Sequence, residues 1–140
     1  MFKTVLALGM TAIISQTAMA AETAASASAP EAKVYIISPE NGATVSETFT
    51  VQFGLSGMGV APAGTDKANT GHHHLMVDGE QAPMAGKAMG QEVMHFGGGQ
   101  TETTITLTPG QHTLQLILGD MGHAPHNPPV ASEVITVTVE

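Results

Sequence analysis

Residues 47–55 read ETFTVQFGL, a stretch in which apolar and polar side chains alternate. A period of two sends successive side chains to opposite faces of a β-strand. One face would then be apolar and turned toward a core, formed by Phe49, Val51, Phe53 and Leu55. Residues 47–55 therefore predict a half-buried strand.

Six further segments have the same β-branched or alternating character and are separated by turn-forming residues such as Pro39-Glu40-Asn41-Gly42 and Asp78-Gly79. The sequence shows no convincing helix. About seven short strands in one small domain are typical of an immunoglobulin-like Greek-key β-sandwich, with a jelly roll or a small barrel as the alternatives. The six further strands are expected at residues 34–38, 74–78, 92–96, 101–108, 112–118 and 133–140.

The first 20 residues have the layout of a secretory signal peptide. A positive start at Met1-Phe2-Lys3 precedes an apolar run, and Ala18-Met19-Ala20 has the small-x-small pattern of a cleavage site. We expect a signal peptide at 1–20, a flexible linker at 21–32 and the β-sandwich domain at 33–140. The protein is then periplasmic or secreted, with no membrane insertion after cleavage.

The charge balance limits the classes of partner. Twelve acidic residues face four basic ones, giving a formal net charge of −8. Nucleic-acid binding needs a basic surface, so this composition excludes it and favours metal cations or basic partners. The chain contains no cysteine, which excludes disulfides and a thiolate-based blue-copper site.

Histidine is the residue type that points to chemistry. In a Greek-key sandwich, alternate loops meet at one end, and this topology would gather six of the seven histidines there. His112 follows a turn of the opposite end and should lie apart. The six that we expect to gather are His72, His73, His74, His95, His123 and His126.

Neutral imidazole binds copper, zinc and nickel. His72 and His74 are two residues apart, so a strand would point both to one face, and His73 would point toward the core. Asp120 could add an oxygen ligand or orient a ring, and Met94 could add a thioether beside His95. Each candidate also has an ordinary structural interpretation: histidines hydrogen-bond to loop carbonyls, and methionines fill gaps in a core.

Three motifs resemble a family of small bacterial periplasmic proteins catalogued as a domain of unknown function, whose members are sometimes mislabelled as rod-shape-determining proteins. They are SGMGVAPAGTDKANTGHHHL (56–75), HFGGGQTETT (95–104) and GQHTLQLILGD…H…PHNPPV (110–130), in which the single H is His123. The resemblance covers nearly all of 33–140 and implies an exported β domain, without an established activity. The motif positions include every histidine of the chain and Asp120.

Three hypotheses follow. The first is a periplasmic protein that binds copper, or alternatively zinc, and buffers the ion or delivers it to an envelope protein. The second is a cell-envelope module that binds protein or glycan without a metal. The third is a copper-dependent oxidoreductase, although the chain offers no nucleophile motif and no obvious carboxylate pair.

Overall fold

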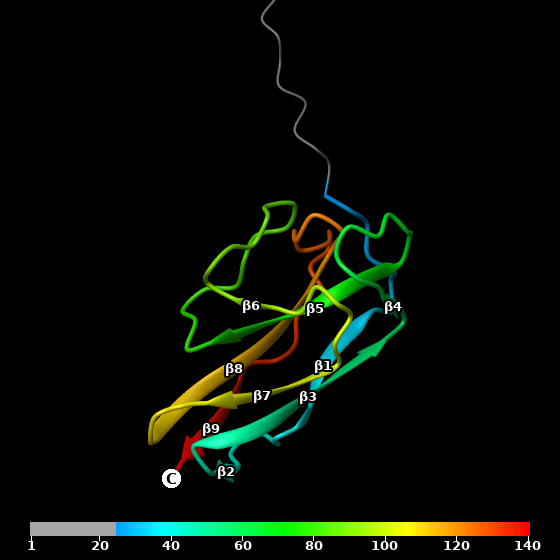
Figure 1. The fold of residues 1–140 in the computed structure, drawn as a ribbon. Coiled ribbons are helices and arrows are strands. Elements are labelled where there is room, and N and C mark those ends of the chain that lie inside the picture. Colours follow the sequence, from blue (N-terminus) through cyan, green and yellow to red (C-terminus); the bar gives the residue numbers. More distant parts are fainter. Residues whose placement is uncertain (1–24) are drawn as a thin grey trace, which may run out of the picture.

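The computed structural model describes residues 25–140, which form two β-sheets packed face to face (Figure 1). No helix occurs in this range, and accordingly none within it is long and apolar enough to cross a membrane. The strands are β1 (Lys33–Ser38), β2 (Thr44–Val45), β3 (Thr48–Ser56), β4 (Gly59–Val60), β5 (Thr70–Val77), β6 (Met94–His95), β7 (Glu102–Thr106), β8 (Gly110–Gly119) and β9 (Ile135–Val139).

The strand order is that of an immunoglobulin-like sandwich. One sheet has the order β1-β3-β7, and the other has the order β2-β9-β8-β5-β4. The seven expected strands are all present, and six of them divide between the sheets as the A, B, E and G, F, C strands of that fold do. The two added strands, β2 and β4, are short and pair in parallel with β9 and β5. The predicted all-β sandwich is therefore confirmed.

One strand takes a position that matters for the site. The short β6 pairs with β5 of the larger sheet and not with β7. Its register sets His95 directly opposite His74. The strand pairing alone thus brings together two histidines that are 21 positions apart in the sequence.

The core lies between the sheets and is built from the alternating residues of facing strands. Val51 and Phe53 of β3 pack with Leu75 of β5 and with Leu114, Leu116 and Leu118 of β8. Each such side chain contributes about 1.5–3 kcal/mol when it is fully buried. The alternation read from residues 47–55 is what directs Val51 and Phe53 inward.

The outer face of the larger sheet is covered as well. A second apolar cluster joins Met76 of β5 and Ile117 of β8 to Met89, with Val93 packed against it. An antiparallel sheet commonly leaves one face in water, but here the segment after β5 folds back over β5 and β8. Strand β5 is consequently buried on both faces, which explains why three consecutive histidines are inaccessible to solvent.

The expected signal peptide at 1–20 lies outside the described residues. Within the expected linker, residues 25–32 are described, and Ser26 and Ser28 contact a later loop. The Ser26 carbonyl accepts a hydrogen bond from the N–H of Asn127, and the Ser28 N–H donates to the carbonyl of Asn127. The Ser26 hydroxyl also donates to Oδ2 of Asp120 at 2.7 Å.

Candidate metal centre

Two histidines of the site come from β5, where alternation places them on the outer face of the larger sheet. The rings of His72 and His74 have their centroids 4.6 Å apart. Both side chains are almost completely buried, with 1% of their surface exposed. The strand begins at Thr70, four residues before the predicted start, because Thr70 and Gly71 pair with β4, and β8 pairs with β5 from His72 onward. The predicted common face of His72 and His74 follows directly from this pairing.

The third histidine comes from β6. Because His95 lies opposite His74, its ring projects to the same face of the sheet. Nε2 of His95 lies 3.1 Å from Nε2 of His72. Unlike the β5 pair, the His95 side chain is exposed to solvent.

The fourth histidine, His123, lies in the loop after β8. Its backbone has φ of 66°, the left-handed conformation that few non-glycine residues adopt. The N–H of His123 donates to the carbonyl of Asp120, and Oδ1 of Asp120 accepts hydrogen bonds from the N–H groups of Gly122 and Ala124. These bonds hold the turn that directs Nδ1 of His123 to within 3.1 Å of Nε2 of His72.

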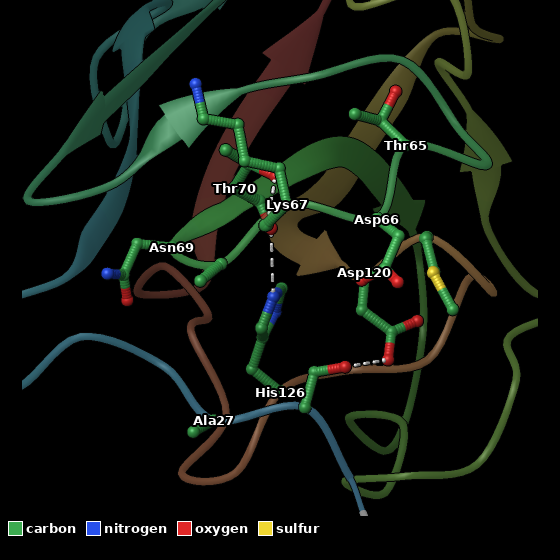
Figure 2. Close-up of a pocket in the computed structure, with 11 residues that line it drawn as sticks. Ala27, Thr65, Asp66, Lys67, Asn69, Thr70, Asp120 and His126 are labelled. Atoms are coloured by element: carbon green, nitrogen blue, oxygen red, sulfur yellow. Dashed lines mark hydrogen bonds between the residues drawn. The ribbon is translucent and has the colours of Figure 1, made fainter.

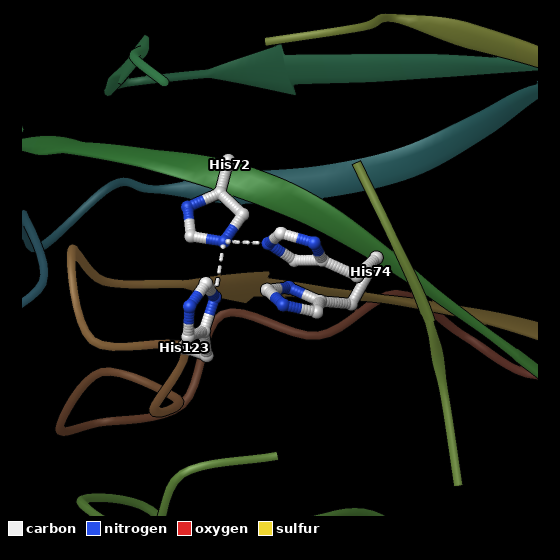
Figure 3. A group of neighbouring side chains, drawn as sticks. His72, His74 and His123 are labelled. Atoms are coloured by element: carbon white, nitrogen blue, oxygen red, sulfur yellow. Dashed lines mark hydrogen bonds between the residues drawn. The ribbon is translucent and has the colours of Figure 1, made fainter. Parts of the chain in front are cut away.

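Four ring nitrogens, one from each of these histidines, lie within 4.8 Å of one another (Figure 3). An ion with tetrahedral bonds of about 2.0–2.1 Å needs ligand nitrogens about 3.3–3.4 Å apart. Two of the separations are already 3.1 Å, so small side-chain movements would complete such a shell. We call His72, His74, His95 and His123 the four-histidine group.

Hydrogen bonding does not account for this arrangement. Among residues 25–140, neither ring nitrogen of the buried His74 has a hydrogen-bond partner. Nε2 of His72 has two close nitrogen neighbours, yet it carries one hydrogen at most and cannot donate to both. Buried polar atoms are nearly always paired, and lone pairs that converge in this way would be paired by a cation.

The local electrostatics favour neutral rings. Burial, reinforced by the neighbouring rings of His95 and His123, lowers the pKa of His72 to about 4. Burial and the other three rings lower the pKa of His74 to about 3. Burial and the nearby His123 also lower the pKa of His95. Near neutral pH these three rings therefore keep a free lone pair, which is the form that binds a metal.

Two glycines make room for the rings. A Cβ on Gly97 would lie 2.3 Å from Cε1 of His95, and a Cβ on Gly119 would lie 2.4 Å from Cε1 of His74. Contacts this short require the ring or the backbone to shift. Sequence patterns do not reveal the role of Gly119, because it depends on a ring from the neighbouring strand β5.

Of the eight residues proposed from the sequence, the structure brings these four histidines together. His73 points into the sandwich, as expected, where its ring packs 5.1 Å from that of Phe53 between centroids. Met94 pairs with Leu75 on β5, so its side chain lies on the face opposite to His95. Asp120 serves the turn around His123 through its carboxylate and is not among the residues that could share an ion.

His126 also lies apart from the four-histidine group. Its Nε2 donates to the carbonyl of Thr70 at 3.2 Å. With Asp120 it lines a pocket of about 270 Å³ between the 65–70 segment and the N-terminal residues Ser26 and Ala27, shown in Figure 2. None of the four clustered histidines lines this pocket. At the opposite end of the domain, His112 bonds to Asp78 through Nδ1 at 2.6 Å.

Comparison with known proteins gives one match. No curated protein and no solved structure matched the chain. A family model described as "Domain of unknown function (DUF4399)" matches residues 51–140, a range that includes all seven histidines and the strands from β4 to β9. Because this match spans more than half of the chain, the protein belongs to the DUF4399 family.

Proposed function

We propose that this protein is a periplasmic copper-binding protein that holds one ion in the four-histidine group and buffers it or passes it to an envelope partner. The observation that carries the proposal is the ring of His74. It is 1% exposed, has no hydrogen-bond partner on either nitrogen among residues 25–140, and lies among three other imidazoles. A bound ion would accept a lone pair from a nitrogen of this ring and from the neighbouring imidazole nitrogens.

The donor set supports copper among the common metals. Four imidazole nitrogens suit copper and zinc, and nitrogen sites in general bind Cu(II) more tightly than Zn(II). Zinc remains the alternative ion for the same ligands. The expected signal peptide and the absence of cysteine from the chain agree with an exported protein that has no thiolate with which to select its metal.

Buffering or delivery fits the ligand set better than catalysis does. Four protein ligands fill a tetrahedral shell, whereas catalytic metal sites keep a position for substrate or water. The four ligands also differ in access: His72 and His74 are buried, His123 is partly buried and His95 is exposed. A partner can therefore approach from the side of His95 and replace ligands one at a time.

The test is a competition titration with Cu(I), Cu(II) and Zn(II). The protein is produced from the full-length chain without an affinity tag, because a histidine tag would bind the same ions. We expect one ion per chain with a dissociation constant below about 1 μM, equivalent to about −8.2 kcal/mol. The double variant His72→Ala/His74→Ala should lose this binding. Weak binding of every ion, or unchanged affinity in the double variant, would refute the proposal.

Localisation needs a separate measurement. Fractionation of cells that express the full-length chain should recover the protein in the periplasm, shortened at its N-terminus by about 20 residues. Intact protein in the cytoplasm would contradict the exported location and would leave the metal titration unaffected.

A further inference from the structure

Met89 lies close to the ring of His74, neither of whose nitrogens has a hydrogen-bond partner among residues 25–140. The Cβ position of Gly119 is 2.4 Å from Cε1 of His74 and 3.2 Å from Cε of Met89, so the ring and the thioether methyl approach the same small space. Cε1 lies between the two ring nitrogens. The side chain of Met89 therefore lies close to the His74 ring.

We propose that Met89 supplies a thioether ligand to Cu(I) in place of one imidazole of the four-histidine group and so favours Cu(I) over Zn(II). This inference rests on the proposed metal site. The exchange brings in a ligand of a different chemical class, because thioether sulfur is a soft donor that prefers Cu(I), whereas imidazole serves both ions.

The backbone holds Met89 in register with the site. Its N–H donates to the carbonyl of His123 at 2.8 Å, which ties the segment carrying Met89 to the turn carrying another ligand. Its side chain is buried, with 8% exposed, and packs with Met76 and Ile117. Movement of the His123 turn toward an ion would therefore carry Met89 with it.

The side chain can also adapt. Methionine is unbranched and has three rotatable bonds, so a change of rotamer can move its sulfur toward the nearby His74 ring. The surroundings are apolar, formed by Met76, Ile117 and Val93.

The other methionines with described side chains nearby are placed differently. The sulfur of Met76 lies over Gly79, where a Cβ would meet it at 2.2 Å, beyond the end of β5 and away from the rings. Met84 is 72% exposed, and Met94 lies on the opposite face of the sheet. Met76 is therefore the matched control: a buried methionine of the same cluster whose sulfur is directed elsewhere.

The experiment compares wild-type protein with Met89→Leu and Met76→Leu, two substitutions that nearly conserve side-chain volume. Cu(I) and Zn(II) affinities are measured by competition, and the Cu(I)-loaded proteins are examined by X-ray absorption. We expect Met89→Leu to weaken Cu(I) binding by about tenfold or more and to leave Zn(II) binding nearly unchanged. A sulfur neighbour of the copper should appear in wild type and Met76→Leu and be absent from Met89→Leu.

The outcomes separate the two proposals. A wild-type Cu(I) spectrum without sulfur, or equal Cu(I) affinity in Met89→Leu and wild type, overturns the role of Met89 and leaves the four-histidine site in place. Wild-type protein that binds neither ion overturns the metal site itself and this inference with it. The wild-type spectrum decides the question even if Met89→Leu does not fold.

Discussion

The ring of His74 occupies the space that a side chain at residue 119 would need, since a Cβ on Gly119 would lie 2.4 Å from its Cε1 atom. Gly119 belongs to β8, directly opposite His72, and has an ordinary strand conformation. Glycine is thus needed at residue 119 because of the His74 ring on the neighbouring strand, and not because of the backbone conformation of residue 119.

Substitution of this glycine should damage the site more than the fold. In Gly119→Ala we expect the His74 ring to be displaced, with metal affinity reduced about 10- to 100-fold, the scale seen when residues that orient a metal ligand are lost. Gly59→Ala is the matched control, because a Cβ on that strand glycine meets only Thr70 at an ordinary 3.7 Å. Titration of both variants checks the prediction, and equal affinities would contradict it.

Metal should stabilise the folded protein, because the four ligands are assembled only when β5, β6 and the loop after β8 are in place. At a free metal concentration of about 100 times the dissociation constant, the gain is about 2.7 kcal/mol. For a domain of this size that corresponds to a rise in Tm of about 10 °C or more. Calorimetry of apo and loaded protein measures this shift.

The variants His123→Ala and His126→Ala separate a ligand from a neighbour in the same loop. His123→Ala should lose most of the metal-induced rise in Tm. His126→Ala should keep the rise, although it removes a hydrogen bond to Thr70 and lowers the stability of both forms. A reversed pattern would move the ligand assignment to His126.

Asp120 should act on the site through the turn that it holds. Partial burial alone would raise its pKa, but the hydrogen bonds from Ser26, Ala124 and Gly122 outweigh burial and lower it. Asp120→Ala removes these bonds and should weaken metal binding about 10-fold or more. Ser26→Ala removes one bond and should have a smaller effect, while Asp120→Asn keeps an acceptor for the turn and should lie between them. Equal metal affinity in Asp120→Ala and wild type would exclude this positioning role.

His73 should make the protein sensitive to acid. Burial lowers its pKa from 6.5 to about 4, so below pH 6.5 the unfolded chain binds a proton that the folded chain does not. The free energy of unfolding is therefore unaffected by this residue above pH 6.5 and decreases as the pH falls. His73 alone lowers it by about 2 kcal/mol at pH 5. His73→Leu should remove that loss and, since both ring nitrogens are buried without partners among residues 25–140, add about 1–3 kcal/mol at pH 7.5.

Chemical denaturation of wild type and His73→Leu at pH 7.5 and pH 5 tests both parts, with metal affinity as the control for an intact site. A variant less stable than wild type at pH 7.5 would show that the His73 ring has a partner, such as a buried water, that the leucine displaces.

The ion pair between His112 and Asp78 should change the stability of the protein with pH in the direction opposite to that of His73. Hydrogen bonds to the Asp78 carboxylate and the Thr108 carbonyl raise the pKa of His112. The folded chain therefore holds this proton more tightly, and the stabilisation is full below pH 6.5 and lost as the pH rises through the higher folded pKa. Because the pair is near the surface, it contributes at most about 1 kcal/mol.

Comparison of wild type with Asp78→Asn at pH 5.5 and pH 8.5 checks this. The asparagine keeps an acceptor for the N–H of Thr113 but removes the negative charge. Wild type should be more stable than the variant at pH 5.5, and the difference should nearly vanish at pH 8.5. A stability difference between wild type and Asp78→Asn that grows with pH would contradict an ion pair with protonated His112.

The sandwich and the common face of His72 and His74 could be predicted from alternation, whereas His95 and His123 could be placed near them only through the expected Greek-key topology. The period of two in residues 47–55 directs Val51 and Phe53 inward, and the same period along β5 separates His72 and His74 from His73. Local spacing of this kind determines the direction of a side chain as soon as the strand is recognised.

The rest of the site depends on long-range structure. The sequence predicts that both His123 and His126 join the gathered histidines, but the φ of 66° at His123 turns its ring to the four-histidine group while His126 bonds to Thr70. Met94 is the thioether candidate from the sequence because it adjoins His95, but adjacent residues of a strand point to opposite faces of the sheet. Proximity of Met89 to His74 arises only when the loop after β5 folds back over the sheet.

The 3.1 Å approach of His72 to His123 has a consequence for a chain that contains no cysteine. An ion shared by these residues closes a loop of 51 positions, as a disulfide would. By chain-entropy arguments, a covalent cross-link over a loop of that length lowers the conformational entropy of the unfolded state and so stabilises the fold by about 4 kcal/mol. A bound ion would act as a cross-link that forms after folding and is reversible. Release of the ion would therefore also lower the stability of the folded protein.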